Sequence, residues 1–73
     1  MKVTYDPEAD AVFIEIATGD YDESEEVAPN VMLDFDKQGR VLAVEVLTAS
    51  KVLAPGDWTK AALPGGEQVE AAE

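Results

Sequence analysis

Apolar and polar residues alternate along much of the chain, most clearly in residues 41–47, which read VLAVEVL. Period-two order with many β-branched residues is typical of a strand. Leu42, Val44 and Val46 fall on one face, whereas the other face combines apolar residues with Glu45. Because neither face is uniformly polar, we predict a central strand that is covered on both sides.

The same alternation predicts a hairpin at the start of the chain. Residues 2–5 and 11–16 read as its two strands, and residues 6–10, DPEAD, lie between them. Pro7 fixes φ and the side chain of Asp6 accepts hydrogen bonds from the backbone that follows it, which is turn chemistry.

A second hairpin leads into the central strand. Residues 31–36, VMLDFD, alternate, and residues 37–40, KQGR, predict a tight turn in which we expect Gly39 to have a positive φ. The acidic residues 21–28 read either as a loop or as an edge strand near residues 24–27, since charge protects a sheet edge from aggregation. We favour the edge strand.

The predicted fold is therefore α+β and mostly β, an antiparallel meander of four or five strands with one short C-terminal helix. The helix is expected over residues 57–63, DWTKAAL, with Asp57 as its N-cap. Residues 1–64 form a single small β-rich domain, and residues 65–73 are expected to be a disordered acidic tail.

Composition and charge narrow the classes of function. The 73 residues include 16 acids against 5 bases, a net charge of −11, and nine acids lie in residues 1–30. Nucleic acids and anionic membranes are bound through bases, so we expect neither as a partner. A basic protein partner fits this charge, and so does an acidic surface that only promotes solubility. The N-terminus has no apolar signal region and no run is long enough to span a bilayer, so we expect a cytoplasmic protein.

The second face of the predicted sheet is too apolar to face water. Its apolar residues are Phe13, Met32, Val41, Ala43 and Leu47. Either the segment around Trp58 folds over them or a second subunit does. Domains of this size are often stabilised by disulfides, metals or oligomerisation, and the chain has no Cys and no His. We therefore predict a homodimer, formed sheet against sheet or through strand edges, and no cofactor.

Two short patterns suggest chemistry at first sight. Asp6, Glu8 and Asp10 alternate as in a calcium loop, but such a loop needs Gly at its sixth position and Glu at its twelfth, where this chain has Ala11 and Ala17. We expect a turn there and no metal site.

Ser50 precedes Lys51, a combination that activates the serine of Ser-Lys hydrolases. Adjacent residues on an extended chain point apart, so we expect Ser50 to cap or turn the chain after the central strand.

Three segments resemble one family. They are residues 5–14, YDPEADAVFI, residues 31–36 with Gly39 and Arg40, and residues 44–51, VEVLTASK. Their order and spacing are similar to those of the DUF2283 family, a small bacterial and archaeal domain of unknown function. The resemblance covers residues 1–53 and fails at Thr48, where the family commonly has Asp. The candidate family-motif residues are Tyr5, Asp10, Asp34, Glu45 and Ser50.

The resemblance implies a small, mostly antiparallel β domain. It also implies an antitoxin-like role, because family members are often encoded beside small toxin-like proteins. The leading hypothesis is thus a non-enzymatic protein-interaction module directed at a small basic partner. Its candidate interaction residues are Phe13, Met32, Leu47, Tyr21, Glu23, Glu25 and Glu26.

The alternative is a small enzyme or metal-binding protein that uses a carboxylate cluster. Asp34, Glu45 and Glu15 share the second face, and paired carboxylates perform acid–base work. A single sheet of this size offers no deep cleft, so we expect these acids to pair with Arg40 or Lys51, or to cap backbone groups, at an interface, and we assign no catalytic residue.

Overall fold

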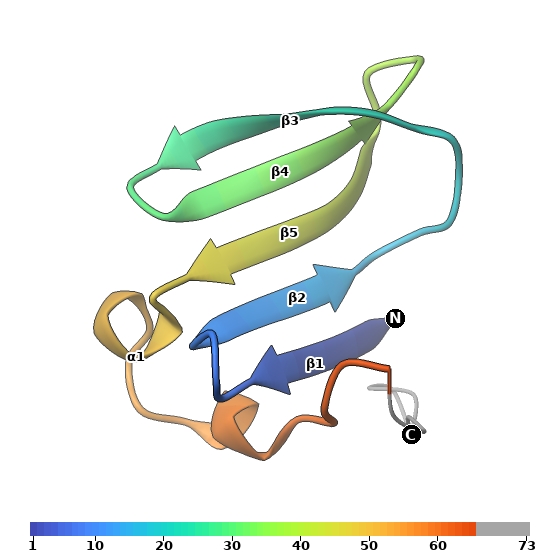
Figure 1. Ribbon diagram of the computed structural model, residues 1–73. Helices are drawn as coiled ribbons and strands as arrows, with labels where there is room; N and C mark the ends of the chain where they lie inside the picture. The colour runs from blue at the N-terminus through green and yellow to red at the C-terminus, as the bar shows by residue number, and fades with distance from the viewer. Residues whose placement is uncertain (66–73) are drawn as a thin grey trace.

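Five antiparallel strands form one sheet in the order β1-β2-β5-β4-β3 (Figure 1). The computed structural model describes residues 1–65. The elements are β1 (Lys2–Asp6), β2 (Ala11–Glu15), β3 (Tyr21–Ala28), β4 (Val31–Asp36), β5 (Val41–Leu47), the helix α1 (Ala49–Val52) and the 3-10 helix η1 (Asp57–Lys60). The prediction of a mostly β, antiparallel protein with a short helix after the strands is confirmed. The sheet is not a sequential meander, because β5 lies between β2 and β4.

The central position of β5 follows from its pairing along both edges. Val46 lies opposite Val12 of β2 and Val31 of β4, and Val44 lies opposite Ile14 and Leu33. Residues directly opposite each other in antiparallel strands share a face. One face of the sheet is therefore continuously apolar from β2 to β4.

A bulge in β5 shifts this alternation at its beginning. Asp34 pairs with Ala43 but Phe35 pairs with Val41, which leaves Leu42 as an extra residue. Leu42 consequently lines the same hollow as Ala43, although simple alternation places it with Val44. Val41 pairs with Phe35 rather than joining the face of Ala43, so its predicted place on the second face is wrong.

The connection between β2 and β3 crosses the ends of β5 and β4 (Figure 1). The second strand ends at Glu15 rather than at Ile16, because the backbone N–H groups of Ile16 and Ala17 both donate to the carbonyl of Leu42, at 2.8 and 3.0 Å. Gly19 permits this crossing, since a Cβ there would lie 3.0 Å from the Leu42 side chain.

The helical segments cover the continuously apolar face. Val12, Val46 and Ala49 are fully buried, and Leu53 and Trp58 pack against them. The rings of Trp58 and Tyr5 meet edge to face, with centroids 5.1 Å apart and an interplanar angle of 82°. We call this side the covered face.

The helix predicted over residues 57–63 is shorter than expected. The 3-10 helix spans Asp57–Lys60, and its N-cap is Gly56 rather than Asp57. Ala61 is extended, and Ala62 pairs in parallel with Thr4 of β1, where the N–H of Tyr5 donates to the Ala62 carbonyl at 2.9 Å. Pairing with the β1 edge satisfies backbone groups that a longer helix would have bonded internally, and the α-helix lies earlier, at Ala49–Val52.

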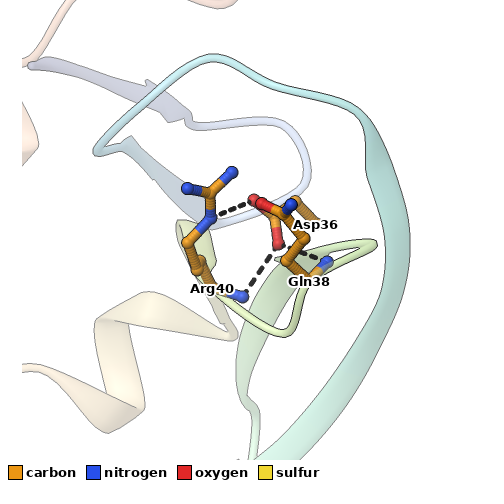
Figure 2. Close-up of polar contacts among 3 residues, drawn as sticks. All are labelled: Asp36, Gln38 and Arg40. Carbon is orange, nitrogen blue, oxygen red and sulfur yellow. Dashed lines mark hydrogen bonds and ion pairs between the residues drawn. The ribbon is translucent and has the colours of Figure 1, made fainter.

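The turn between β4 and β5 is held by Asp36 (Figure 2). Its carboxylate accepts the backbone N–H groups of Gln38 and Arg40, both at 2.9 Å, and Nε of Arg40 at 2.8 Å. These contacts, the Arg40 backbone bond foremost, lower the pKa of Asp36. Gly39 has a φ of 80°, which confirms the predicted turn.

The acidic segment is a complete edge strand. It spans Tyr21–Ala28, longer than the predicted residues 24–27, and irregular pairing with β4 interrupts it near each end. In the described part, no helix is long and apolar enough to cross a membrane. The tail expected to be disordered, residues 65–73, lies outside the described residues except for Gly65.

Thr48 adopts a left-handed conformation, with φ 52° and ψ 47°. This conformation costs an L-residue about 1–2 kcal/mol, and it is least favourable for β-branched side chains. We expect Thr48→Asn to raise the free energy of unfolding by about 1 kcal/mol, as measured by urea denaturation. Thr18→Asn, at a position without a positive φ, serves as the control, and equal effects of the two substitutions would contradict this account.

Candidate functional site

Asp10 joins the first hairpin to the helix after the sheet. Its Oδ2 accepts the Ser50 hydroxyl at 2.6 Å, and its Oδ1 accepts the Tyr5 hydroxyl at 2.8 Å. The backbone N–H of Ser50 also donates to the carboxylate, at 3.1 and 3.2 Å, and the Asp10 carbonyl accepts the N–H of Ala49 at 2.8 Å. We call Tyr5, Asp10 and Ser50 the Asp10 latch.

The latch perturbs two titratable groups. The Ser50 and Tyr5 hydroxyls hold the pKa of Asp10 below its ordinary value, and the hydrogen bond to Asp10 raises the pKa of Tyr5. Ser50 is thus a structural donor to a residue forty positions away, and its hydroxyl donates to Asp10 rather than to Lys51.

The turn that precedes Asp10 is also structural, because Asp6 Oδ1 accepts the N–H groups of Glu8 and Ala9 at 3.0 and 3.3 Å.

Asp34 and Glu45 form a carboxyl pair on the face opposite the helices, which we call the open face. Glu45 lies opposite Met32 and Phe13, and Asp34 lies opposite Ala43, so the two acids are diagonal neighbours on adjacent strands. Asp34 is only 6% exposed. Its Oδ1 accepts the Ser24 hydroxyl at 2.5 Å, and the hydroxyls of Ser24 and Tyr21 lie 2.8 Å apart.

The pair can hold a shared proton near neutral pH. The hydrogen bond with Asp34, partial burial and the charge of Asp34 raise the pKa of Glu45 from 4.5 to about 7. A protonated Glu45 donates to the Asp34 carboxylate, which also accepts from Ser24. The expected pairing of these acids with Arg40 or Lys51 is wrong, because Arg40 bonds Asp36 and Lys51 lies near Asp10.

The open face keeps exposed apolar side chains. Phe13 is 39% and Leu47 42% exposed, whereas Met32 is half-buried and Ala43 is buried. Of the two alternatives for covering this face, the segment around Trp58 is not the cover, because Trp58 packs on the covered face against Tyr5.

The other candidate interaction residues lie on β3, at the acidic edge. Tyr21, Glu23, Glu25 and Glu26 are exposed there. The structure therefore divides the candidate residues between the β3 edge and the open face, and it divides the family-motif residues between the Asp10 latch and the carboxyl pair.

A hollow of about 250 Å³ lies beside the carboxyl pair. It is lined by Asp34, Phe13 and Tyr21, together with the connection after β2. Within residues 1–65, no group of three or more His, Cys, Asp or Glu side chains has a geometry that holds a metal ion.

Sequence reasoning missed two parts of these sites. Ser24 bonds Asp34 across β3 and β4, and Asp36 organises the turn between β4 and β5. The role of Asp36 could have been predicted, because an Asp at the start of a tight turn commonly bonds the turn backbone. No local signal predicts the hydrogen bond between Ser24 and Asp34.

One comparison with known proteins gives a match. The family model described as "Protein of unknown function (DUF2283)" matches residues 2–50, about two thirds of the chain. No curated protein and no solved structure matches the chain.

The Asp10 latch predicts an effect on acid stability. The pKa of Asp10 is lowered by folding, so its stabilising contribution is present above its ordinary pKa and is lost as the pH falls through the lowered value. Asp10→Asn should lower the urea midpoint at pH 7, and the difference from the native chain should shrink below about pH 4. Asp57→Asn is the control, and an equal loss in that variant would contradict the latch.

The carboxyl pair predicts the opposite dependence on pH. Because folding raises the pKa of Glu45 to about 7, its contribution is present below the unfolded pKa and is lost as the pH rises toward about 7. The native chain should lose about 1 kcal/mol of stability between pH 4.5 and pH 8 through this group, after allowing for solvent screening. Glu45→Gln should abolish this loss in urea denaturation series, and Glu15→Gln on the same face should retain it.

Proposed function

Since the chain belongs to the DUF2283 family, whose description assigns no activity, we propose its function from its geometry: a non-enzymatic module that binds a small basic protein along β3. The observation that carries the proposal is the contrast between the two edges of the sheet. One edge is bonded by a later segment of the chain, and the other is long, exposed and acidic.

The β1 edge is partly occupied. Ala62 pairs in parallel with Thr4 and accepts the N–H of Tyr5 at 2.9 Å. β3 forms the opposite edge of the sheet (Figure 1), and every residue of it except Ser24 is exposed. An exposed edge offers backbone N–H and C=O groups to a further strand, which is a common mode of peptide recognition.

Charge indicates which strand fits this edge. β3 carries Asp22, Glu23, Glu25 and Glu26, and Asp20 precedes it. Like charges directly opposite each other destabilise paired strands, so two copies of β3 repel. A strand or segment rich in Lys and Arg is attracted instead, and such complementarity accelerates association more than it adds affinity.

The family resemblance supports the same class of partner. A small toxin-like protein would fit this edge if it is basic and presents an extended segment that pairs with β3. An antitoxin-like role for this chain is the specific form of the proposal.

The carboxyl pair favours a second candidate, a small acid–base enzyme. The raised pKa of Glu45 keeps a proton available near neutral pH, as in general acids. Of the two carboxyl groups, however, only Asp34 lines the adjacent hollow. The interaction module is therefore the function that the geometry supports best.

The proposal is tested by affinity co-purification from native extract at low and high salt, with mass determination of the captured proteins. The doubly substituted chain Glu23→Lys, Glu25→Lys removes acids from β3. We expect the native chain to capture a small basic protein that high salt releases, and this variant to lose it, with at least a tenfold reduction in the amount captured at low salt.

A matched variant makes the same change in net charge elsewhere. Glu8→Lys, Asp57→Lys reverses two exposed acids in the first turn and in η1, and it should capture the partner as the native chain does. Equal capture by both variants, or no basic protein captured by the native chain, would overturn the proposal.

A further inference from the structure

We propose that the open face of the sheet is a homodimer interface, in which a second copy covers Phe13 and Leu47 and encloses the carboxyl pair. This surface is the face of the sheet rather than the β3 edge, although Glu26 of β3 borders both.

The two faces of the sheet are covered to different extents. On the covered face, Leu53 and Trp58 pack over Val12 and Val46, which are at most 4% exposed. On the open face, the side chains of Phe13 and Leu47 remain 39% and 42% exposed. Phe13 and Leu47 are diagonal neighbours on β2 and β5, so their exposed parts adjoin on this face. Adjoining apolar side chains on a surface are candidates for an interaction site.

The size of the face is compatible with a dimer of this chain. The two larger Cα extents of the molecule are 33 and 28 Å, which together span about 900 Å². A stable interface takes about 800 Å² from each partner. A second copy that stacks sheet on sheet therefore supplies enough area only when it covers nearly the whole face.

The position of β5 indicates how two copies superpose. β5 is the middle strand of the five, so a two-fold axis parallel to β5 lays one complete sheet over the other. Aligned sheets stack about 10 Å apart with their inner side chains interdigitated. A two-fold axis perpendicular to the strands would instead place β3 over β3.

Charge favours the axis parallel to β5. It brings β1 of one copy, which carries Lys2 on the open face, over the acidic β3 of the other copy. Lys2 is placed on this face by its pairing with Glu15, and Glu26 by its pairing with Met32. The alternative axis would stack the two β3 strands, each of which carries Glu26 on the open face. Direct β3-to-β3 edge pairing would bring all the acids of the two strands together.

The carboxyl pair lies close to the proposed axis, because Glu45 is on β5. The groups that face it are Asp34 on β4 and Glu15 on β2, with Lys2 and Glu26 one strand farther away. Enclosing Glu45 next to Asp34 favours its protonated form. Association therefore takes up protons and is stronger at low pH.

Sedimentation equilibrium of the native chain at pH 6 and pH 8 measures this directly. We expect a concentration-dependent dimer whose dissociation constant rises by up to 100-fold from pH 6 to pH 8, a tenfold effect for the Glu45 of each copy. Glu45→Gln should keep the dimer and lose most of its pH dependence. This comparison does not depend on any disruptive substitution.

Leu47→Asp, at the end of the middle strand on this face, should give a folded monomer, with folding checked by the fluorescence of Trp58 on the opposite face. Val52→Asp places the same change on α1, at a residue of similar exposure, and should remain dimeric. A native chain that is monomeric at both pH values, a folded Leu47→Asp variant that still dimerises, or a pH dependence that survives Glu45→Gln would overturn the proposal.

Discussion

The contacts of Asp10 determine how the rest of the molecule is arranged. A single carboxylate ties the first turn to Ser50 and, through the Tyr5 hydroxyl, to the ring that Trp58 contacts edge to face. The helix that follows β5 is thereby fixed over Val12 and Val46. Within residues 1–65 the helical segments after β5 cover the sheet on one side, and fixing them there leaves most of the other face to solvent or to another molecule. The latch is a local set of hydrogen bonds, yet it decides which side of the protein is available for interactions.

The distribution of acids then separates the available surface into two regions with different chemistry. At the β3 edge the acids are exposed to solvent, so they act through their long-range field, which repels an identical strand and attracts bases. On the open face Asp34 is buried and Glu45 half-buried, and the raised pKa of Glu45 lets this pair hold a shared proton near neutral pH. An edge of exposed acids and a face that also carries exposed apolar side chains are suited to different kinds of association. The first is fast and sensitive to salt, and the second depends on shape and on apolar area.

Most of the strands could be predicted from the sequence because their information is local. Alternation identified β1, β2, β4 and β5, and Gly39 identified the last turn. The errors arose where a distant contact decides the local structure. Pairing of Ala62 with β1 ended the expected helix, the bulge at Leu42 reassigned Val41, and Asp10 meets Ser50 across forty residues. Only the family resemblance grouped Asp10 with Ser50, and it did so without indicating that they touch. The carboxyl pair was predicted to share a face, but its partner Ser24 was not, since β3 had no clear register from its own residues.

The carboxyl pair is difficult to explain by the stability of a single chain. Two acids placed diagonally on adjacent strands repel each other when both are ionised, and either residue as an amide would avoid this cost. The pair is nevertheless well supported, because Ser24 donates to Asp34 and the tyrosine hydroxyl of Tyr21 lies against Ser24. Exclusion of water strengthens such hydrogen bonds and disfavours the second charge. If a second molecule lies over the open face, the carboxyl pair changes from an arrangement that is unfavourable in water to a directional hydrogen bond inside an interface. Protonation of Glu45 is then a condition for that contact.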